Sequence, residues 1–261
     1  MIRYVLLGLV QGLTEFLPVS SSGHLVLAER ALGLDSPGVL LEAFLHLGTL
    51  VAVLWVFRRD ILSLFSAFTR RGSLDRRKEV GLLLAGTIPI VLAGLLFRDV
   101  ADTVFSSLWV VGGGLLLTAI ALTAAARLRQ RTTYRTVSFL DSLAIGVAQV
   151  LALFPGVSRS GITISAGVAR RIEPMRAARF SFLLSIPALV GAVVLNLWDA
   201  AEVGWPADWA GIAVGTVSAL VVGLFGIHAL LAVVRRSRLW AFAIYCGGLG
   251  LAVLVYALVA A

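Results

Sequence analysis

Long apolar stretches, separated by short polar segments, dominate the chain. A helix that crosses a membrane needs roughly 20 mostly apolar residues, and we find six such stretches. They cover about 38–57, 79–98, 104–126, 177–198, 209–234 and 239–260. The pattern therefore predicts an all-α polytopic membrane protein with six transmembrane helices.

Two further apolar stretches, 2–31 and 137–171, are interrupted near their centres. The interruptions are Glu15, Pro18, Ser20, Ser21, Ser22 and His24 in the first, and Pro155, Gly156, Ser158, Arg159, Ser160 and Gly161 in the second. We expect each stretch to form two short helices around a polar loop, as in a re-entrant hairpin. Irregular backbone at membrane depth persists only where it is buried in protein or lines an aqueous cavity. Both loops are therefore candidate functional segments.

Composition supports the membrane assignment and excludes most soluble enzymes. Of the 261 residues, 59% are hydrophobic and only 14% are charged, against about 25% charged in a typical soluble domain. A single cysteine excludes a disulfide framework, and three scattered histidines do not form a zinc motif. Any bound metal should therefore have oxygen ligands.

The basic residues gather on one side of the expected topology. If each hairpin returns to its own side, that side carries 18 of the 22 lysines and arginines. They lie in residues 58–78, 127–135, 170–179 and 235–238. The positive-inside rule makes this side cytoplasmic. We thus expect a multi-pass protein of the inner (plasma) membrane with both termini outside, and the net charge of +8 requires no nucleic-acid partner.

The two interrupted stretches are related by a shift of 138 residues. Residues 8–23 and 146–161 then share 8 identities in 16 positions, where average residue usage gives about one or two. We expect one membrane domain over residues 1–261, with repeat 1 at about 1–126 and repeat 2 at about 137–261. Each repeat has one hairpin and three crossings, so the second is inverted relative to the first. Inverted repeats with broken helices place a polar site near the midplane, where loops 15–24 and 155–163 should meet tip to tip.

The two loops carry complementary chemistry. A charged side chain at the centre of a spanning helix costs about 2.5–3.5 kcal/mol, so Glu15 and Arg159 both need a partner. Arg159 offers a planar fork for phosphate, and the carboxylate of Glu15 suits a hard divalent cation. The imidazole of His24 can move a proton near neutral pH. This set indicates phosphoryl hydrolysis, although a transporter or lipid flippase for an anionic substrate has the same architecture.

The loop sequences resemble a known family. Gln11-Gly-Leu-Thr-Glu15-Phe-Leu-Pro-Val-Ser-Ser-Ser-Gly-His24 is similar to the first signature of the undecaprenyl-diphosphate phosphatases, also called bacitracin-resistance proteins. Pro155-Gly-Val-Ser-Arg-Ser-Gly-Ile-Thr163 matches the second signature, and the similarity covers nearly the whole chain. The resemblance implies hydrolysis of undecaprenyl diphosphate, a polyprenyl diphosphate, to the monophosphate and inorganic phosphate. This recycles the lipid carrier of cell-wall synthesis and confers bacitracin resistance.

The resemblance also implies residue roles and partners. Glu15 and Gln11 fall on the two ends of the E/Q-x-x-x-E motif, so they are the expected ligands of Mg²⁺ or Ca²⁺. Ser21 falls on the hydroxyl often proposed as the nucleophile, with His24 as base and then acid and Arg159 as phosphate ligand; attack by His24 or by water stays open. The expected substrate-binding hydroxyls are Ser20, Ser22, Ser158, Ser160 and Thr163. Membrane lipids surround the prenyl tail, the site should open outward, and a homodimer is left open.

Overall fold

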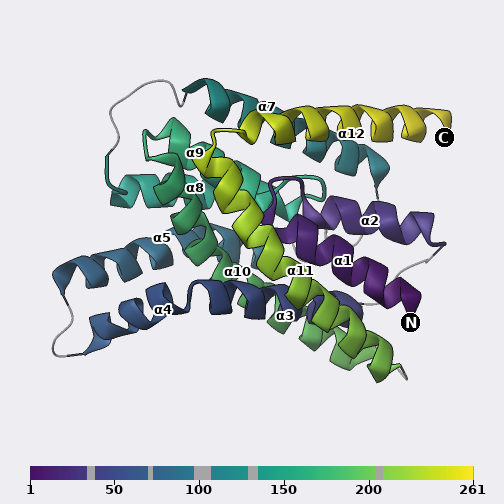
Figure 1. Ribbon diagram of the computed structural model, residues 1–261, viewed down its shortest axis with the longest axis horizontal. Coiled ribbons are helices and arrows are strands. Elements are labelled where there is room, and N and C mark those ends of the chain that lie inside the picture. Colours follow the sequence, from purple (N-terminus) through teal and green to yellow (C-terminus); the bar gives the residue numbers. More distant parts are fainter. Residues whose placement is uncertain (34–38, 70–72, 97–106, 129–134, 204–207, 261) are drawn as a thin grey trace.

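The structure, a computed structural model, describes residues 1–33, 39–69, 73–96, 107–128, 135–203 and 208–260, and its described elements are helices (Figure 1). The α-helices are α1 (Ile2–Phe16), α2 (Ser21–Ala31), α3 (Val39–Val56), α4 (Arg58–Phe65), α5 (Leu74–Leu96), α7 (Leu108–Leu128), α8 (Phe139–Val150), α9 (Arg159–Ala169), α10 (Pro174–Val203), α11 (Trp209–Arg235) and α12 (Leu239–Val259). Two 3₁₀ turns, η1 (Ser66–Phe68) and η2 (Leu151–Leu153), extend α4 and α8. Within the described ranges, one isolated β-bridge joins Arg135 to Ile172. The expected all-α class is confirmed.

Five of the described helices are long and apolar enough to cross a membrane: α5, α7, α10, α11 and α12. A sixth crossing is reached if α3 and α4 are one span, and the chain bends by 74° between them. The chain is therefore an integral membrane protein. The first of the six expected crossings, at 38–57, corresponds to α3, which is shorter than these five helices and qualifies as a span only together with α4.

Both interrupted stretches fold as helix pairs, α1 with α2 and α8 with α9. In each pair the second helix has 11 residues. A serine caps each of these helices: the Ser20 hydroxyl accepts from the backbone N–H of Gly23, and the Ser158 hydroxyl accepts from that of Gly161. A side-chain oxygen at this position satisfies an N–H that has no partner inside the helix. The serines therefore determine where each second helix begins.

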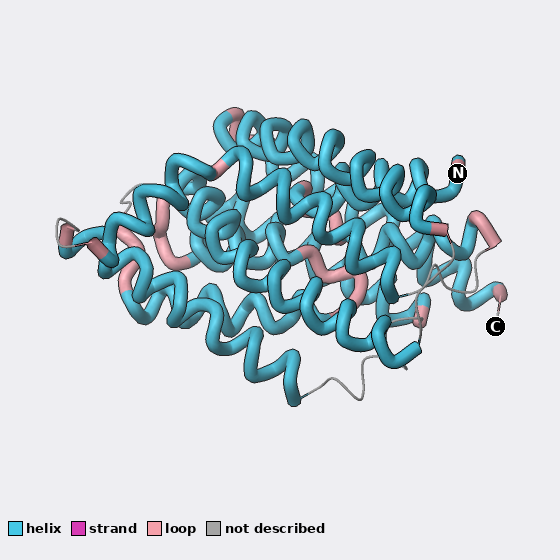
Figure 2. The backbone as a smooth tube through the Cα atoms, turned by 90° about the horizontal axis from the view of Figure 1, so that it is seen from below, coloured by secondary structure: helices cyan, strands magenta, loops and turns pink. Residues whose placement is uncertain are grey.

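The hydrophobic core is packed directly behind the first loop. Phe16, the last residue of α1, is fully buried against Phe182 of α10, with 5.9 Å between ring centroids. Phe182 also contacts Phe57 at the bend between α3 and α4, at 5.1 Å. These contacts tie the end of α1 to the centre of the bundle. Both termini lie at one end of the molecule in two perpendicular views (Figures 1 and 2).

Glycines let two helix pairs approach at backbone contact. A Cβ added at Gly8 of α1 would lie under 3.0 Å from the carbonyl oxygen of Gly215 in α11. A Cβ added at Gly146 of α8 would collide in the same way with Gly86 of α5. Gly8 and Gly146 are equivalent positions of the sequence repeat. Each first helix is thus held against a long helix of the other half of the chain.

The contact between Gly146 and Gly86 leads to a stability prediction. Gly146→Ala should separate α8 from α5, because its Cβ would meet backbone atoms that cannot move aside. Overpacking of this kind typically costs about 1–3 kcal/mol, so thermal unfolding in detergent should shift to a lower temperature. Gly81→Ala is the matched control, because a Cβ on Gly81 of α5 has no neighbour within 4 Å. Equal melting temperatures for the two variants would contradict the close approach.

Candidate active site

The two polar loops meet through an ion pair. Arg159, the first residue of α9, places Nη2 2.6 Å from Oε1 of Glu15 near the end of α1. The two side chains are only 13% and 6% exposed. The charged groups that the sequence required to be partnered are therefore each other's partners. The contact brings together residues 144 positions apart.

Glu15 also gathers two uncharged side chains. Its Oε2 accepts a hydrogen bond of 2.6 Å from the Ser21 hydroxyl, the first residue of α2, and one of 3.2 Å from the side-chain amide of Gln11. Gln11 lies one helical turn before Glu15 and is fully buried, and its Oε1 has no hydrogen-bond partner. A carboxylate that accepts from a hydroxyl can take its proton when that oxygen attacks a substrate.

The expected phosphate-binding hydroxyls lie in the first turns of the two capped helices. Ser20 Oγ lies 3.3 Å from Ser22 Oγ, and Ser158 Oγ lies 3.2 Å from Ser160 Oγ, so the two helices begin with the same arrangement. A Cβ on Gly23 of α2 would lie only 3.0 Å from Cα of Gly156 in the second loop. The start of α2 therefore abuts the second loop. Helix starts offer free N–H groups and a positive dipole end, which favour anions.

The hydroxyl of Thr163, unlike those of the other predicted residues, contacts the neighbouring helix α10. Its hydroxyl lies 2.7 Å from the backbone oxygen of Arg159 and 2.6 Å from the hydroxyl of Ser181 in α10. These bonds anchor α9 to α10 one turn beyond the ion pair. The structure thus gives Thr163 contacts inside the protein.

The second loop is supported by a threonine that sequence reasoning did not select. Thr118 of α7 accepts from the backbone N–H of Ser158 at 2.9 Å, and its hydroxyl lies 3.1 Å from the carbonyl oxygen of Gly156. Gly156 has φ +89°, a backbone conformation that glycine adopts without strain. The only sequence signal of Thr118 is a hydroxyl inside an otherwise apolar stretch, which is a weak signal.

His24 lies in the first turn of α2, and both nitrogens of its ring have partners other than the Ser21 hydroxyl. Nδ1 is 2.8 Å from the backbone oxygen of Ser20, and Nε2 is 2.7 Å from the hydroxyl of Tyr245 in α12. The described contacts include no hydrogen bond between His24, the expected base, and Ser21. Tyr245 was not among the predicted site residues, since it lies in an apolar stretch with no motif.

The donor set of the cluster is compatible with a divalent cation that is shared with a substrate. Among the described residues, no three His, Cys, Asp or Glu side chains are arranged to enclose a metal ion. Glu15 supplies one carboxylate, and the unpartnered Oε1 of Gln11 is a neutral oxygen beside it. Mg²⁺ is commonly held by one or two carboxylates together with substrate phosphates and water. The residues present fit that mode of binding.

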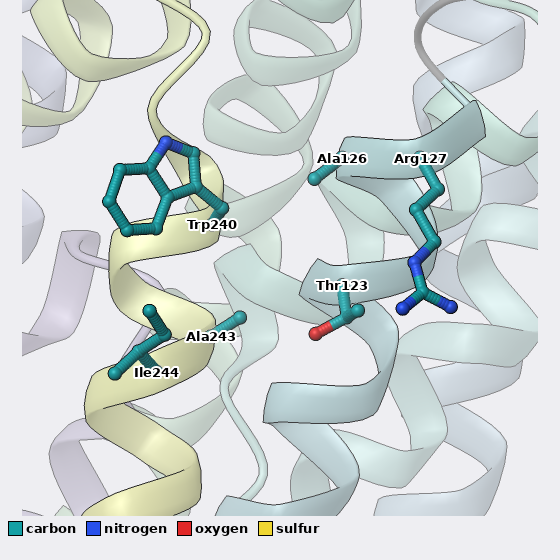
Figure 3. A pocket seen from close by; sticks show the side chains of 6 residues that line it. All are labelled: Thr123, Ala126, Arg127, Trp240, Ala243 and Ile244. Atoms are coloured by element: carbon teal, nitrogen blue, oxygen red, sulfur yellow. The ribbon is translucent and has the colours of Figure 1, made fainter.

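A separate cavity of about 290 Å³ lies between α7 and α12. It is lined by Thr123, Ala126, Arg127, Trp240, Ala243 and Ile244 (Figure 3). The lining has one cationic side chain but no carboxylate or imidazole, so it lacks the groups needed for acid–base chemistry. The candidate active site is therefore the cluster around Glu15.

Comparison with known proteins agrees with the chemistry of this cluster. The family model of the bacitracin resistance protein BacA matches residues 4–252. An undecaprenyl-diphosphatase of Desulfatibacillum aliphaticivorans is 42% identical, covering 97% of this chain and 98% of the relative. An undecaprenyl-diphosphatase of Rubrobacter xylanophilus is 44% identical, covering 94% of this chain and 94% of the relative. One of Halothermothrix orenii is 38% identical, covering 98% of this chain and 97% of the relative. Because these similarities extend over nearly the whole chain, the protein belongs to the bacitracin resistance protein BacA family.

Proposed function

We propose that the protein hydrolyses undecaprenyl diphosphate to undecaprenyl monophosphate and inorganic phosphate. In the cell this reaction recycles the lipid carrier of cell-wall synthesis and confers resistance to bacitracin. The observation that carries the proposal is the contact of Arg159 and Ser21 with the buried Glu15, which would bring a phosphate ligand, a proton acceptor and a nucleophile together. Family membership and the names of the relatives support the same activity.

Arg159 would exchange its partner when the substrate binds. A diphosphate brings more negative charge than the single carboxylate of Glu15, and the guanidinium fork matches two phosphate oxygens. The hydroxyls of Ser22 and Ser160 and the N–H groups at the starts of α2 and α9 would add donors. Releasing Glu15 from the ion pair at this moment would leave its carboxylate basic and free to act.

Ser21 is the proposed nucleophile. Its Oγ would attack the terminal phosphorus while the bond from that phosphorus to the bridging oxygen breaks, and undecaprenyl monophosphate leaves. The hydroxyl already donates to Glu15 at 2.6 Å, which supports Glu15 as the acceptor of the Ser21 proton in place of the expected His24. Water would then hydrolyse the phosphoserine and release inorganic phosphate, with His24 close by in the same turn of α2 to move protons.

Glu15 and Gln11 are the proposed ligands of a Mg²⁺ or Ca²⁺ ion. Such an ion neutralises charge on phosphate oxygens. The support is the single carboxylate next to an unpartnered amide oxygen, both buried.

We also propose that α1–α2 and α8–α9 are re-entrant hairpins of an inverted repeat within one membrane domain. The equivalent serine caps and glycine contacts support the repeat. At the base of the second hairpin, Asp141 in the first turn of α8 lies 2.7 Å from Arg135 before α8 and 2.7 Å from Arg170 at the end of α9. The two ends of this hairpin therefore lie together, as re-entry on one side requires. The protein would lie in the inner membrane with a site that opens outward.

The role of Arg159 is tested by Arg159→Lys. Lysine keeps the charge but cannot make the bidentate contact, and loss of one such stabilising group costs about 10²–10³ in rate. Phosphate release from undecaprenyl diphosphate in detergent should fall by that factor. Arg176→Lys, at a side chain 60% exposed, is the control and should retain activity. A folded Arg159→Lys protein that releases phosphate within twofold of the wild-type rate would disprove the role of Arg159. If wild type itself releases no phosphate, a transporter or flippase is favoured.

Metal binding is tested at Gln11. Gln11→Glu adds an anionic oxygen beside Glu15, so half-maximal phosphate release should need less Mg²⁺ or Ca²⁺. Glu15→Gln should nearly abolish activity, because no carboxylate would remain. The measurement is a metal titration of phosphate release, with folding checked by gel filtration. An unchanged midpoint in Gln11→Glu, together with a Glu15→Gln variant that no metal concentration rescues, would assign Glu15 to proton transfer or substrate orientation instead of metal binding.

Orientation is tested by labelling introduced cysteines in intact cells. Ser73→Cys, between α4 and α5, should react only with reagents that reach the cytoplasm, and Ala260→Cys, after α12, only from outside. Both positions are exposed, whereas the native Cys246 is fully buried, so wild type is the unlabelled control. Labelling of both cysteines from the same side would overturn the topology.

A further inference from the structure

Two neighbouring residues of α12 contact the first loop from outside the sequence motif. Tyr245 bonds to His24, and the Cys246 thiol lies 3.4 Å from the backbone oxygen of Pro18. They therefore contact the loop near both of its ends. Helix α12 otherwise packs along α7 at the edge of the bundle (Figure 1). An edge helix that reaches a catalytic loop can do more than anchor the chain in lipid.

The partners of His24 determine which ring nitrogen carries the proton. A backbone carbonyl only accepts hydrogen bonds, so Nδ1, 2.8 Å from the Ser20 oxygen, must be the protonated nitrogen. In a neutral ring Nε2 then has a lone pair, and the Tyr245 hydroxyl, 2.7 Å away, donates to it. If the ring gains a second proton, Nε2 donates and the phenol oxygen accepts. Tyr245 can therefore hold the imidazole in both of its protonation states.

The planes of the two rings are also nearly parallel. Their centroids are 5.7 Å apart and their planes differ by 13°. Contact with the phenol ring restricts rotation of the imidazole, while the hydroxyl fixes the direction of Nε2. These two contacts are separable by mutation, because phenylalanine keeps the ring and removes only the hydroxyl.

We propose that Tyr245 is a positioning residue for the reaction, acting through His24. It holds the ring of His24, whose Nδ1–H is fixed by the Ser20 carbonyl, with Nε2 as the basic nitrogen, until water or a phosphate oxygen replaces the phenol hydroxyl. The inference rests on the proposed function, because it needs His24 to move a proton during hydrolysis. It extends the active site to α12, whose sequence there is apolar apart from the phenol and the thiol.

The experiment compares Tyr245→Phe with wild type in kinetics and in nitrogen NMR. Phosphate release should show kcat about tenfold lower, the rate equivalent of one ordinary hydrogen bond, with KM within about twofold. In protein carrying ¹⁵N-histidine, the Nε2 signal of His24 should shift because this nitrogen loses the hydrogen bond from the phenol, while Nδ1 stays protonated. The chain has only three histidines, so His46 and His228 are internal references. Tyr256→Phe, at an exposed tyrosine of the same helix, is the matched control and should behave as wild type.

The outcomes separate this inference from the proposed function. Wild-type kinetics together with unchanged His24 signals in Tyr245→Phe would overturn the role of Tyr245, while hydrolysis by wild type would uphold the function. A raised KM with unchanged kcat would also overturn it, because the phenol would then contact the substrate itself. If wild type releases no phosphate, the function fails, and the positioning role fails with it even where the His24 signals change in Tyr245→Phe.

Discussion

The buried ion pair between Glu15 and Arg159 is the interaction on which the rest of the site depends. Each charge alone would be costly inside a membrane, and the two groups lie at the breaks between the helices of two separate helix pairs. A fold that keeps both must therefore bring the two loops into contact. Breaking such a pair from one side is more costly than never having it, because the remaining charge is left uncompensated. In the proposed reaction a charged substrate would take the place of Glu15 as the partner of Arg159.

Small residues and short side chains make this meeting feasible. Gly8 lets α1 lie at backbone contact with α11, and Gly146 lets α8 lie at backbone contact with α5. The ends of α1 and α8 that lead into the loops therefore come close to the centre of the bundle. Ser20 and Ser158 cap the helices that follow, and a cap of this kind is typically worth about 1 kcal/mol. Each cap also places a helix start, with its free N–H groups, at the junction. The features that stabilise the loops are therefore the features that suit them to an anion.

Helices outside the two helix pairs also contact the candidate site. Thr118 of α7 holds the backbone of the second loop on both sides of Val157, while Tyr245 and Cys246 of α12 contact the first. The two helices pack against each other, so the support for one loop is coupled mechanically to the support for the other. A substitution in either helix can thus disturb catalysis without touching the substrate.

The sequence by itself determined the membrane class, the two interrupted stretches and the need of both Glu15 and Arg159 for a partner. These follow from local periodicity and from the energy of a charge in lipid, which depend on the residues alone. The loop motifs also predicted the residues of the cluster around Glu15, which are Gln11, Ser21 and Arg159. What only the tertiary structure decided is which atoms meet: Ser21 donates to Glu15, and His24 bonds to Tyr245. The physical reason is that hydrogen-bond partners across helices depend on packing and rotation of whole elements, and an apolar helix such as α12 gives no local signal of which of its faces reaches a polar loop.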